Sequence, residues 1–213
     1  MPNVRRVIER VERAFAGVEY PGAGFLQGSF DGCEPAEAIA PFTKRTRWQG
    51  LEAAVLDDHA EALSFLSEGG FRFFLPAYLV ADLRDGLVRA DPVFHLTHGF
   101  EDDVTVEVPT RAGTHQRRLG RTVLINPRRY GALTVEDWAR HRLAVFARAE
   151  AGAIVAYLEY KRDAGADDLL VPRIDQALDR FWRARAASAP DAAALAEHLR
   201  AEAAFLRDVT GGD

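Results

Sequence analysis

A chain of 213 residues, 48% of them hydrophobic, is long enough to bury a sizeable core, and its length favours a single domain over residues 1–213. Its formal net charge of −5 argues against nonspecific binding to nucleic acid, and its one cysteine, Cys33, excludes an internal disulfide. The N-terminus carries Glu9 and Glu12 in place of an apolar targeting stretch, so we expect a cytoplasmic protein that is not bound to a membrane.

The first predicted elements are helices. Apolar residues from Val4 to Phe15 form one stripe of an amphipathic helix, which ends at the Tyr20 to Gly22 turn. After a glycine-rich loop, a short helix is predicted from Pro35 to Pro41. One longer helix then follows from Leu51 to Leu66, with leucines and a valine on its buried side.

The stretch from Ala62 to Leu83 is apolar on nearly every side of a helix, which is typical of a helix in a protein core. Its uninterrupted apolar run, Phe73 to Ala81, is much shorter than the roughly 20 residues of a membrane span. Ser67 is the predicted N-cap. Pro76 removes one amide, a defect that costs about 3 kcal/mol in a helix interior, so we expect a kink or a break near Leu75.

The pattern changes in the second half of the chain. Alternating valines from Val104 to Val108 and a β-rich stretch from Leu119 to Ile125 predict one β-hairpin over about residues 104–125. Thr134 and Asp137 resemble a capping box that opens a helix. Periodicity alone would let this helix continue to Lys161.

Two prolines open the last predicted helices. Pro172 begins one that carries Ile174 and Trp182, and Pro190 begins the final one, which we expect over 190–208. The linker from Ala186 to Ala189 would allow that final helix to move. The elements together predict a mainly α fold of the α+β class, a compact bundle of about seven helices around the proline-kinked central helix, with one inserted hairpin.

The run LSFL followed by SEGGFRFFLPAYL, Ser67 to Leu79, resembles the signature LxF[LF][TS]xExFR[YF][YF]LPA[FY]L of a bacterial family known only as a domain of unknown function. The stretches NPRRYGALTVEDWARHRLAVF and EAGAIVAYLEYKR resemble its second half, and the resemblance spans about residues 1 to 185. The chain has Ser67, Glu68 and Gly69 where the family usually has T-P-E, which leaves the geometry of the helix start open. The resemblance implies a helix break near Phe146 and a new helix before Glu150. It assigns no activity, substrate or catalytic residue to the chain.

Arg72 is the first candidate binding residue, because a guanidinium on an apolar helix must keep water or find an anion. Two interpretations are open. Arg72 pairs with Glu68 or with an acid from another helix, which is the commoner arrangement, or it binds a ligand in a pocket with Tyr78 and Trp48.

A second candidate is an arginine-rich segment between Arg111 and Tyr130, which contains no acidic residue. Such a segment suits phosphate, nucleic acid or an acidic partner, although its arginines can equally pair with the acidic remainder of the chain. The predicted anion patch consists of Arg117, Arg118, Arg121, Arg128 and Arg129.

Signals for metal binding and standard catalysis are weak. The close pair His95 and His98 is accompanied by neither CxxC nor HExxH, so we predict no metal site and no cofactor. The sequence also lacks G-x-S-x-G, a P-loop and GxGxxG, and it therefore offers no recognisable catalytic motif.

Two classes of function follow. The first is a protein-interaction or regulatory module whose partner is another protein, and which uses an apolar groove beside the central helix or the hairpin. The alternative is a small-anion-binding enzyme or ligand-binding protein with its pocket near Arg72, Tyr78 and Trp48. Nucleic-acid binding by the arginine-rich hairpin is less favoured, because the chain as a whole is acidic.

Overall fold

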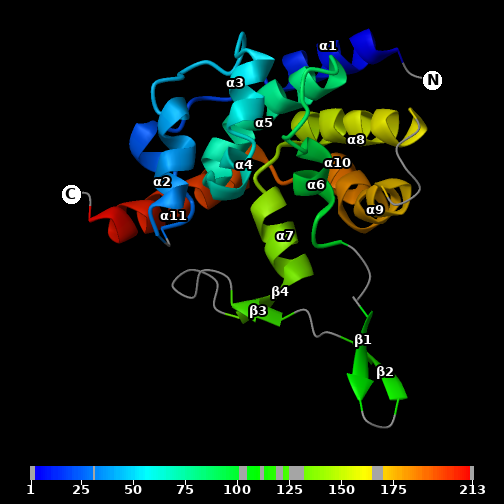
Figure 1. Ribbon diagram of the computed structural model, residues 1–213. Coiled ribbons are helices and arrows are strands. Elements are labelled where there is room, and N and C mark those ends of the chain that lie inside the picture. The colour runs from blue at the N-terminus through cyan, green and yellow to red at the C-terminus, as the bar shows by residue number, and fades with distance from the viewer. Residues whose placement is uncertain are drawn as a thin grey trace.

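The computed structural model describes residues 3–30, 32–100, 105–110, 113–118, 122–124, 132–164 and 170–211. Within them the protein is mainly helical, as predicted, and its strands lie outside the helical body (Figure 1). The elements before the strands are α1 (Val4–Ala14), η1 (Ala23–Phe25), α2 (Glu34–Ile39), η2 (Ala40–Phe42), α3 (Ala53–Asp58), α4 (Ala62–Phe65), α5 (Glu68–Leu83) and α6 (Pro92–Thr97). Those that follow are β1 (Thr105–Thr110), β2 (Gly113–Arg118), β3 (Thr122–Leu124), β4 (Ala132–Thr134), α7 (Val135–Leu143), α8 (Arg148–Asp163), α9 (Leu170–Ala177), η4 (Leu178–Trp182), α10 (Arg183–Ser188) and α11 (Ala192–Thr210).

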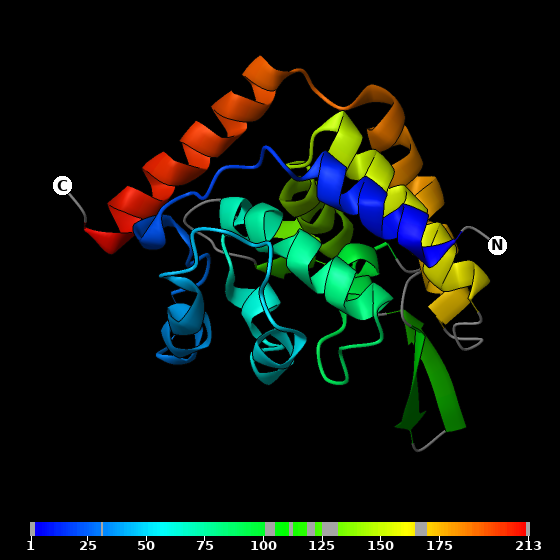
Figure 2. The same ribbon diagram turned by 90° about the horizontal axis from the view of Figure 1, so that it is seen from above.

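The helix α5 lies in the core, as its composition predicts. Thirteen of its sixteen residues are buried, and it packs against α1, α3, α6 and α11. Figure 2 shows α1 beside both α5 and α8, with α11 on the opposite side of the molecule from α9. The central position of α5 therefore brings elements from both ends of the chain together.

Pro76 lies inside α5 without ending it. The helix continues from Glu68 to Leu83, so of the two outcomes expected at the proline, a break does not occur. Phe74 and Tyr78 precede and follow Pro76 by two residues, and the ring of Phe42 lies 5.1 Å from the ring of Phe74 and 6.5 Å from that of Tyr78. Burial of these rings offsets the hydrogen bond that the proline cannot donate.

The start of α5 is fixed by Ser67, the predicted N-cap. Its Oγ accepts a hydrogen bond from the Gly70 amide at 2.9 Å and donates one to the Phe25 carbonyl at 2.6 Å. The extended segment before α5 pairs with residues near Gly28, where a Cβ atom would lie only 2.8 Å from the Leu66 carbonyl oxygen. A glycine at position 28 is therefore required by this close backbone approach.

One helix was predicted from Leu51 to Leu66, and this prediction is wrong. The segment forms the separate helices α3 and α4, with an interruption at His59, whose φ is −117° and ψ is 46°. The helix does not continue through His59, and the His59 carbonyl accepts a hydrogen bond from the Tyr78 hydroxyl at 3.1 Å. The bend lets Leu56 and Leu63 both reach full burial.

The strands form two antiparallel pairs. β1 pairs with β2, from Thr105 opposite Arg118 to Thr110 opposite Gly113, and this hairpin lies within the predicted 104–125 span. Its second strand is earlier than the predicted 119–125, because β3 pairs instead with β4. Val104, Leu119 to Arg121 and Ile125 lie outside the described residues. In Figure 1 both pairs project from the same side of the helical body.

The C-terminal helices follow the sequence prediction closely. Thr134 Oγ1 accepts from the Asp137 amide at 3.0 Å and donates to the Asp137 carboxylate at 2.7 Å, which confirms the cap of α7. α8 is a separate helix, as the resemblance implied. The final helix, α11, starts after its N-cap Asp191. The predicted linker from Ala186 to Ala189 is wrong, because residues 186–188 belong to α10. Movement of α11 stays a prediction.

Candidate functional site

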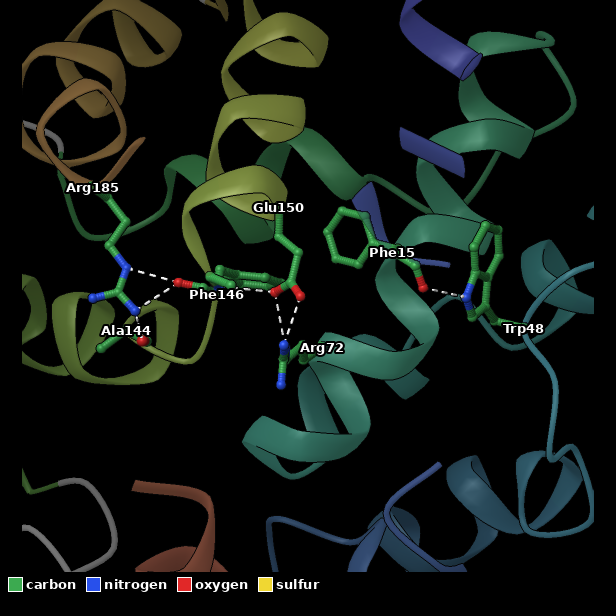
Figure 3. Close-up of polar contacts among 8 residues, drawn as sticks. Phe15, Trp48, Arg72, Ala144, Phe146, Glu150 and Arg185 are labelled. Atoms are coloured by element: carbon green, nitrogen blue, oxygen red, sulfur yellow. Dashed lines mark hydrogen bonds and ion pairs between the residues drawn. The ribbon is translucent and has the colours of Figure 1, made fainter. Parts of the chain in front are cut away.

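Arg72 forms a buried ion pair with Glu150 of α8 (Figure 3). Its Nε donates to Oε2 at 2.8 Å and its Nη2 to Oε1 at 2.6 Å, and the exposed fractions of the two side chains are 15% and 5%. Glu150 Oε2 also accepts from the Ala147 amide at 2.9 Å. The partner is thus an acid from another helix, which was one of the two interpretations that the sequence left open.

Arg185 of α10 binds the connection between α7 and α8, which lies next to the Arg72–Glu150 ion pair. Its guanidinium donates to the carbonyl oxygens of Ala144 and Phe146, in the connection between α7 and α8 (Figure 3). Burial lowers the pKa of Arg185, while the negative charge of Glu150 opposes that shift. The two arginines together fix the connection that precedes α8.

Tyr78 and Trp48 do not lie beside Arg72 in a shared pocket. The Tyr78 hydroxyl donates to the His59 carbonyl at 3.1 Å. The Trp48 Nε1 donates to the Phe15 carbonyl at 3.3 Å, as Figure 3 shows. Burial raises the pKa of Tyr78 well above its ordinary value. Arg72 lines a cavity whose walls include neither of these two residues. A binding role for each of the three residues stays a prediction.

The predicted anion patch falls largely outside the described residues. Arg117 and Arg118 lie in β2, where they are opposite Val106 and Thr105 of β1. Arg121, Arg128 and Arg129 lie outside the part of the chain that the structure describes. Nucleic-acid binding through this patch therefore stays a prediction.

The cavity lined by Arg72 lies between the start of α5 and α11, and we call it the α5–α11 cavity. Its volume is about 530 Å³, and the segment from Gly17 to Pro21 closes it on a third side. Phe25, Leu199 and Leu206 supply apolar walls, while Arg200 and Arg207 belong to its α11 wall. A cavity of this size with a few polar groups is typical of a small-molecule site.

The amides at the start of α5 already have an acceptor. Both carboxylate oxygens of Glu202 bind them, Oε1 at 2.5 Å from the Glu68 amide and Oε2 at 2.8 Å from the Gly69 amide. Glu202 is only 4% exposed. A negative charge at a helix N-terminus is favourable, so this contact holds α11 against α5.

Sequence analysis missed a cluster formed by Glu68, His141 and His198. The three side chains come from α5, α7 and α11, and their ligand atoms lie within 4.8 Å of one another. Glu68 Oε2 lies 2.5 Å from His198 Nε2, and Glu68 Oε1 lies 3.8 Å from His141 Nε2. Because the residues are far apart in the chain, no local motif signals them.

The histidine pair noted in the sequence lies elsewhere, at the end of α6. His95 and His98 line a cavity of about 230 Å³ together with Trp138 and Arg142 of α7. Burial, followed by the positive charge of Arg142 and the interaction with His98, lowers the pKa of His95 to about 3. The rings of Phe71 and Phe94 also face His95, at 6.3 Å and 5.3 Å. His95 is therefore a neutral side chain in the folded protein at neutral pH.

We expect His95 to make the protein acid-sensitive. Its pKa is lowered in the folded state, so the unfolded chain binds the proton first as the pH falls below about 6.5. The stability that His95 contributes is complete above that pH and is lost as the pH falls towards 3. Urea unfolding of the wild type should show a loss of about 2 kcal/mol between about pH 8 and pH 5 that His95→Gln lacks. Identical pH dependence in both proteins would contradict this assignment.

Comparison with known proteins gives a family match for the first half of the chain. No curated protein and no solved structure matches. Among the described residues, none of the helices combines the length and the apolar character that crossing a membrane requires. The second block of resemblance, in α7 and α8, lies beyond the matched residues. Residues 3–98, which include α1 to α6 and the Ser67 to Leu79 segment, match the model of a family of unknown function, DUF6714.

Proposed function

We propose that the protein binds an organic anion with an apolar body in the α5–α11 cavity. The observation that carries this proposal is the cavity itself, about 530 Å³ in volume, with apolar walls and arginines from two helices. Its volume falls within the range of about 300–1,000 Å³ that small-molecule pockets occupy. The proposal develops the ligand-binding alternative that Arg72 suggested in the sequence.

The arginines are arranged to meet an anionic group. Arg200 and Arg207 are seven residues apart, which places them on the same side of α11, and both side chains are exposed. The Arg207 guanidinium lies 5.8 Å from the centre of the Phe25 ring. Deeper in the structure, Nε and Nη2 of Arg72 donate hydrogen bonds to Glu150, so Nη1 is the atom that a ligand would approach.

The apolar body of the ligand follows from what occupies the start of α5. Since Glu202 accepts from both the Glu68 and Gly69 amides, an inorganic anion does not gain these donors. Phe25, Leu199 and Leu206 offer apolar surface instead. Burial of an apolar body against them would supply the binding energy that exposed arginines alone do not give.

The interaction module predicted from the sequence needs an exposed apolar surface. Among the described residues with assigned exposure, the large exposed hydrophobic side chains are Val88 at 91% and Phe94 at 37%. The apolar faces of α5 are covered by its neighbours. The cavity is therefore the better basis for a function. A cytosolic location is part of the proposal, and the single cysteine, Cys33, supports it.

The test is a fluorescence titration with 8-anilinonaphthalene-1-sulfonate, a sulfonate with an apolar aromatic body. The folded protein should bind one molecule, and Ala203→Trp, which fills the cavity from α11, should abolish binding. Arg207→Ala should weaken binding by about two- to fivefold, the size of an exposed charge contact. Arg13→Ala, an exposed arginine on α1, is the matched control.

Inorganic phosphate should neither compete with the dye nor raise the melting temperature, because it lacks the apolar body. Since the dye also binds partly unfolded proteins, each variant is first checked for cooperative urea unfolding. Unchanged dye affinity in a folded Ala203→Trp variant would disprove the proposed cavity site.

A further inference from the structure

The geometry points to a second site, in which Glu68, His141 and His198 bind one divalent transition-metal ion, with zinc as the expected ion. The site is separate from the α5–α11 cavity, whose lining includes none of these three residues. It also departs from the sequence prediction, in which the histidine pair at 95 and 98 was considered and no metal site was expected.

The three ligand atoms are nearly in place for a metal ion. Zinc binds histidine nitrogen and carboxylate oxygen at about 2.0–2.2 Å, so ligand atoms of a tetrahedral site lie about 3.3 Å apart. Here Glu68 Oε2 lies 2.5 Å from His198 Nε2, and the other carboxylate oxygen, Oε1, lies 3.8 Å from His141 Nε2. One ligand atom from each of the three residues lies within 4.8 Å of the other two, so side-chain rotations would bring them to the tetrahedral separation.

Each ligand is placed by a different helix. Glu68 is the first residue of α5, His141 lies in the last turn of α7, and His198 lies in the first half of α11. The two imidazole rings are 5.2 Å apart between centres, and Nε2 of each ring lies within 3.8 Å of the Glu68 carboxylate. Glu202, one turn after His198, binds the amides of α5 and thereby holds α11 in this register.

The local charges favour a cation. Glu68 and Glu202 are 6% and 4% exposed, and both carboxylates lie at the start of α5. A cation beside buried carboxylates is favourable, because it offsets the cost of keeping their negative charge away from water. The cluster also lies near the C-terminal turn of α7, whose partial negative charge favours a cation.

The donor set selects the class of metal. Two imidazole nitrogens and one carboxylate suit zinc and related transition ions, whereas magnesium and calcium prefer oxygen ligands throughout. Three protein ligands leave a fourth position for water or a ligand. The exposed fractions of the side chains are 7% for Glu68, 20% for His198 and 39% for His141, so His141 is the most exposed of the three ligands, although its Nε2 atom is buried.

The test is isothermal titration of the full chain, purified without a histidine tag and stripped with a chelator, using Zn²⁺ as the probe. One Zn²⁺ should bind per chain and raise the melting temperature, because the ion binds the folded form. Co²⁺ in the same site should show the visible absorption of a low-coordinate complex. Lack of Zn²⁺ binding by the wild type would overturn the proposal and would mean that Glu68 and His198 form a hydrogen bond without metal.

The decisive variant is His141→Ala, because it leaves the contacts of α11 with Glu68 and its amides intact. It should weaken Zn²⁺ binding by at least about tenfold, a loss that even supporting groups of metal sites cause. His198→Ala should do the same. The controls are Glu197→Ala, the neighbour of His198 on α11, and His98→Ala in the cavity that His95 and His98 line.

Both controls should keep the wild-type affinity. Zn²⁺ binding that persists unchanged in folded His141→Ala and His198→Ala, or that is lost equally in His98→Ala, would place the ion elsewhere and overturn the assignment. Dye binding in the α5–α11 cavity is measured on the same variants, so failure of one site does not hide the result for the other.

Discussion

Replacing Arg72 by alanine should lower the free energy of unfolding by about 3–5 kcal/mol, because it leaves the Glu150 carboxylate buried without its cation. Glu150→Ala should cost a similar amount, since it leaves the guanidinium without its carboxylate and also removes the acceptor of the Ala147 amide. Urea unfolding at neutral pH measures both, and circular dichroism checks that each variant is still helical.

The double variant distinguishes a lost partner from a net contribution of the pair. Arg72→Ala with Glu150→Ala should cost much less than the sum of the single changes, because neither charge is then left alone. Arg72→Met with Glu150→Leu, which keeps the apolar volume, should lose only about 1–3 kcal/mol, the cost of leaving the Ala147 amide without its acceptor. Additive losses in the double variant would mean that the two side chains act separately and would contradict the ion-pair account.

The ion pair also shows where sequence reasoning reaches its limit. The apolar faces of α5 are local, so residues 67–83 alone indicate a core helix, and the need of Arg72 for an anion follows from the same segment. Its partner is far along the chain on α8, and nothing near either residue identifies it. The resemblance supplied the start of α8 but not the contact, because a contact depends on how two helices pack.

The prediction of one helix from Leu51 to Leu66 was wrong for a similar reason. Helical periodicity from Leu51 to Leu66 is continuous in the sequence, and the contact that the His59 carbonyl makes at the interruption, with the Tyr78 hydroxyl of α5, is not local to that segment. The hairpin was predicted from alternating valines, but the choice of partner strand depends on register, which alternation alone does not fix.

The candidate sites depend still more on packing. Arg72 was found because it is unusual in its own helix, whereas Tyr78 and Trp48 were added to it by residue type and bond elsewhere. Glu68, His141 and His198 are each ordinary in their local sequence. They become a candidate metal site only because the last turn of α7 and the part of α11 around His198 both lie at the start of α5.

The local geometry of the segment that carries Trp182 was also not predicted from the sequence. Replacing Trp182 is the second change for which we expect a large loss of stability. Residues Leu178–Trp182 form a π-helical turn, η4, between α9 and α10, and such a turn shifts the side chains after it relative to an α-helix. Phe181 and Trp182 are both buried, with their rings 5.0 Å apart. The Trp182 Nε1 donates to the Leu96 carbonyl of α6 at 2.8 Å.

Trp182→Ala should lower the free energy of unfolding by about 3–5 kcal/mol, because it empties a fully buried site next to Phe146. Trp182→Phe fills most of that space but leaves the Leu96 carbonyl without its donor, which should cost about 1–3 kcal/mol. The two variants therefore separate ring packing from the hydrogen bond that ties η4 to α6, the helix of His95. Urea unfolding measures both costs, and equal losses in the two variants would mean that the hydrogen bond, and not the volume of the ring, accounts for the role of Trp182.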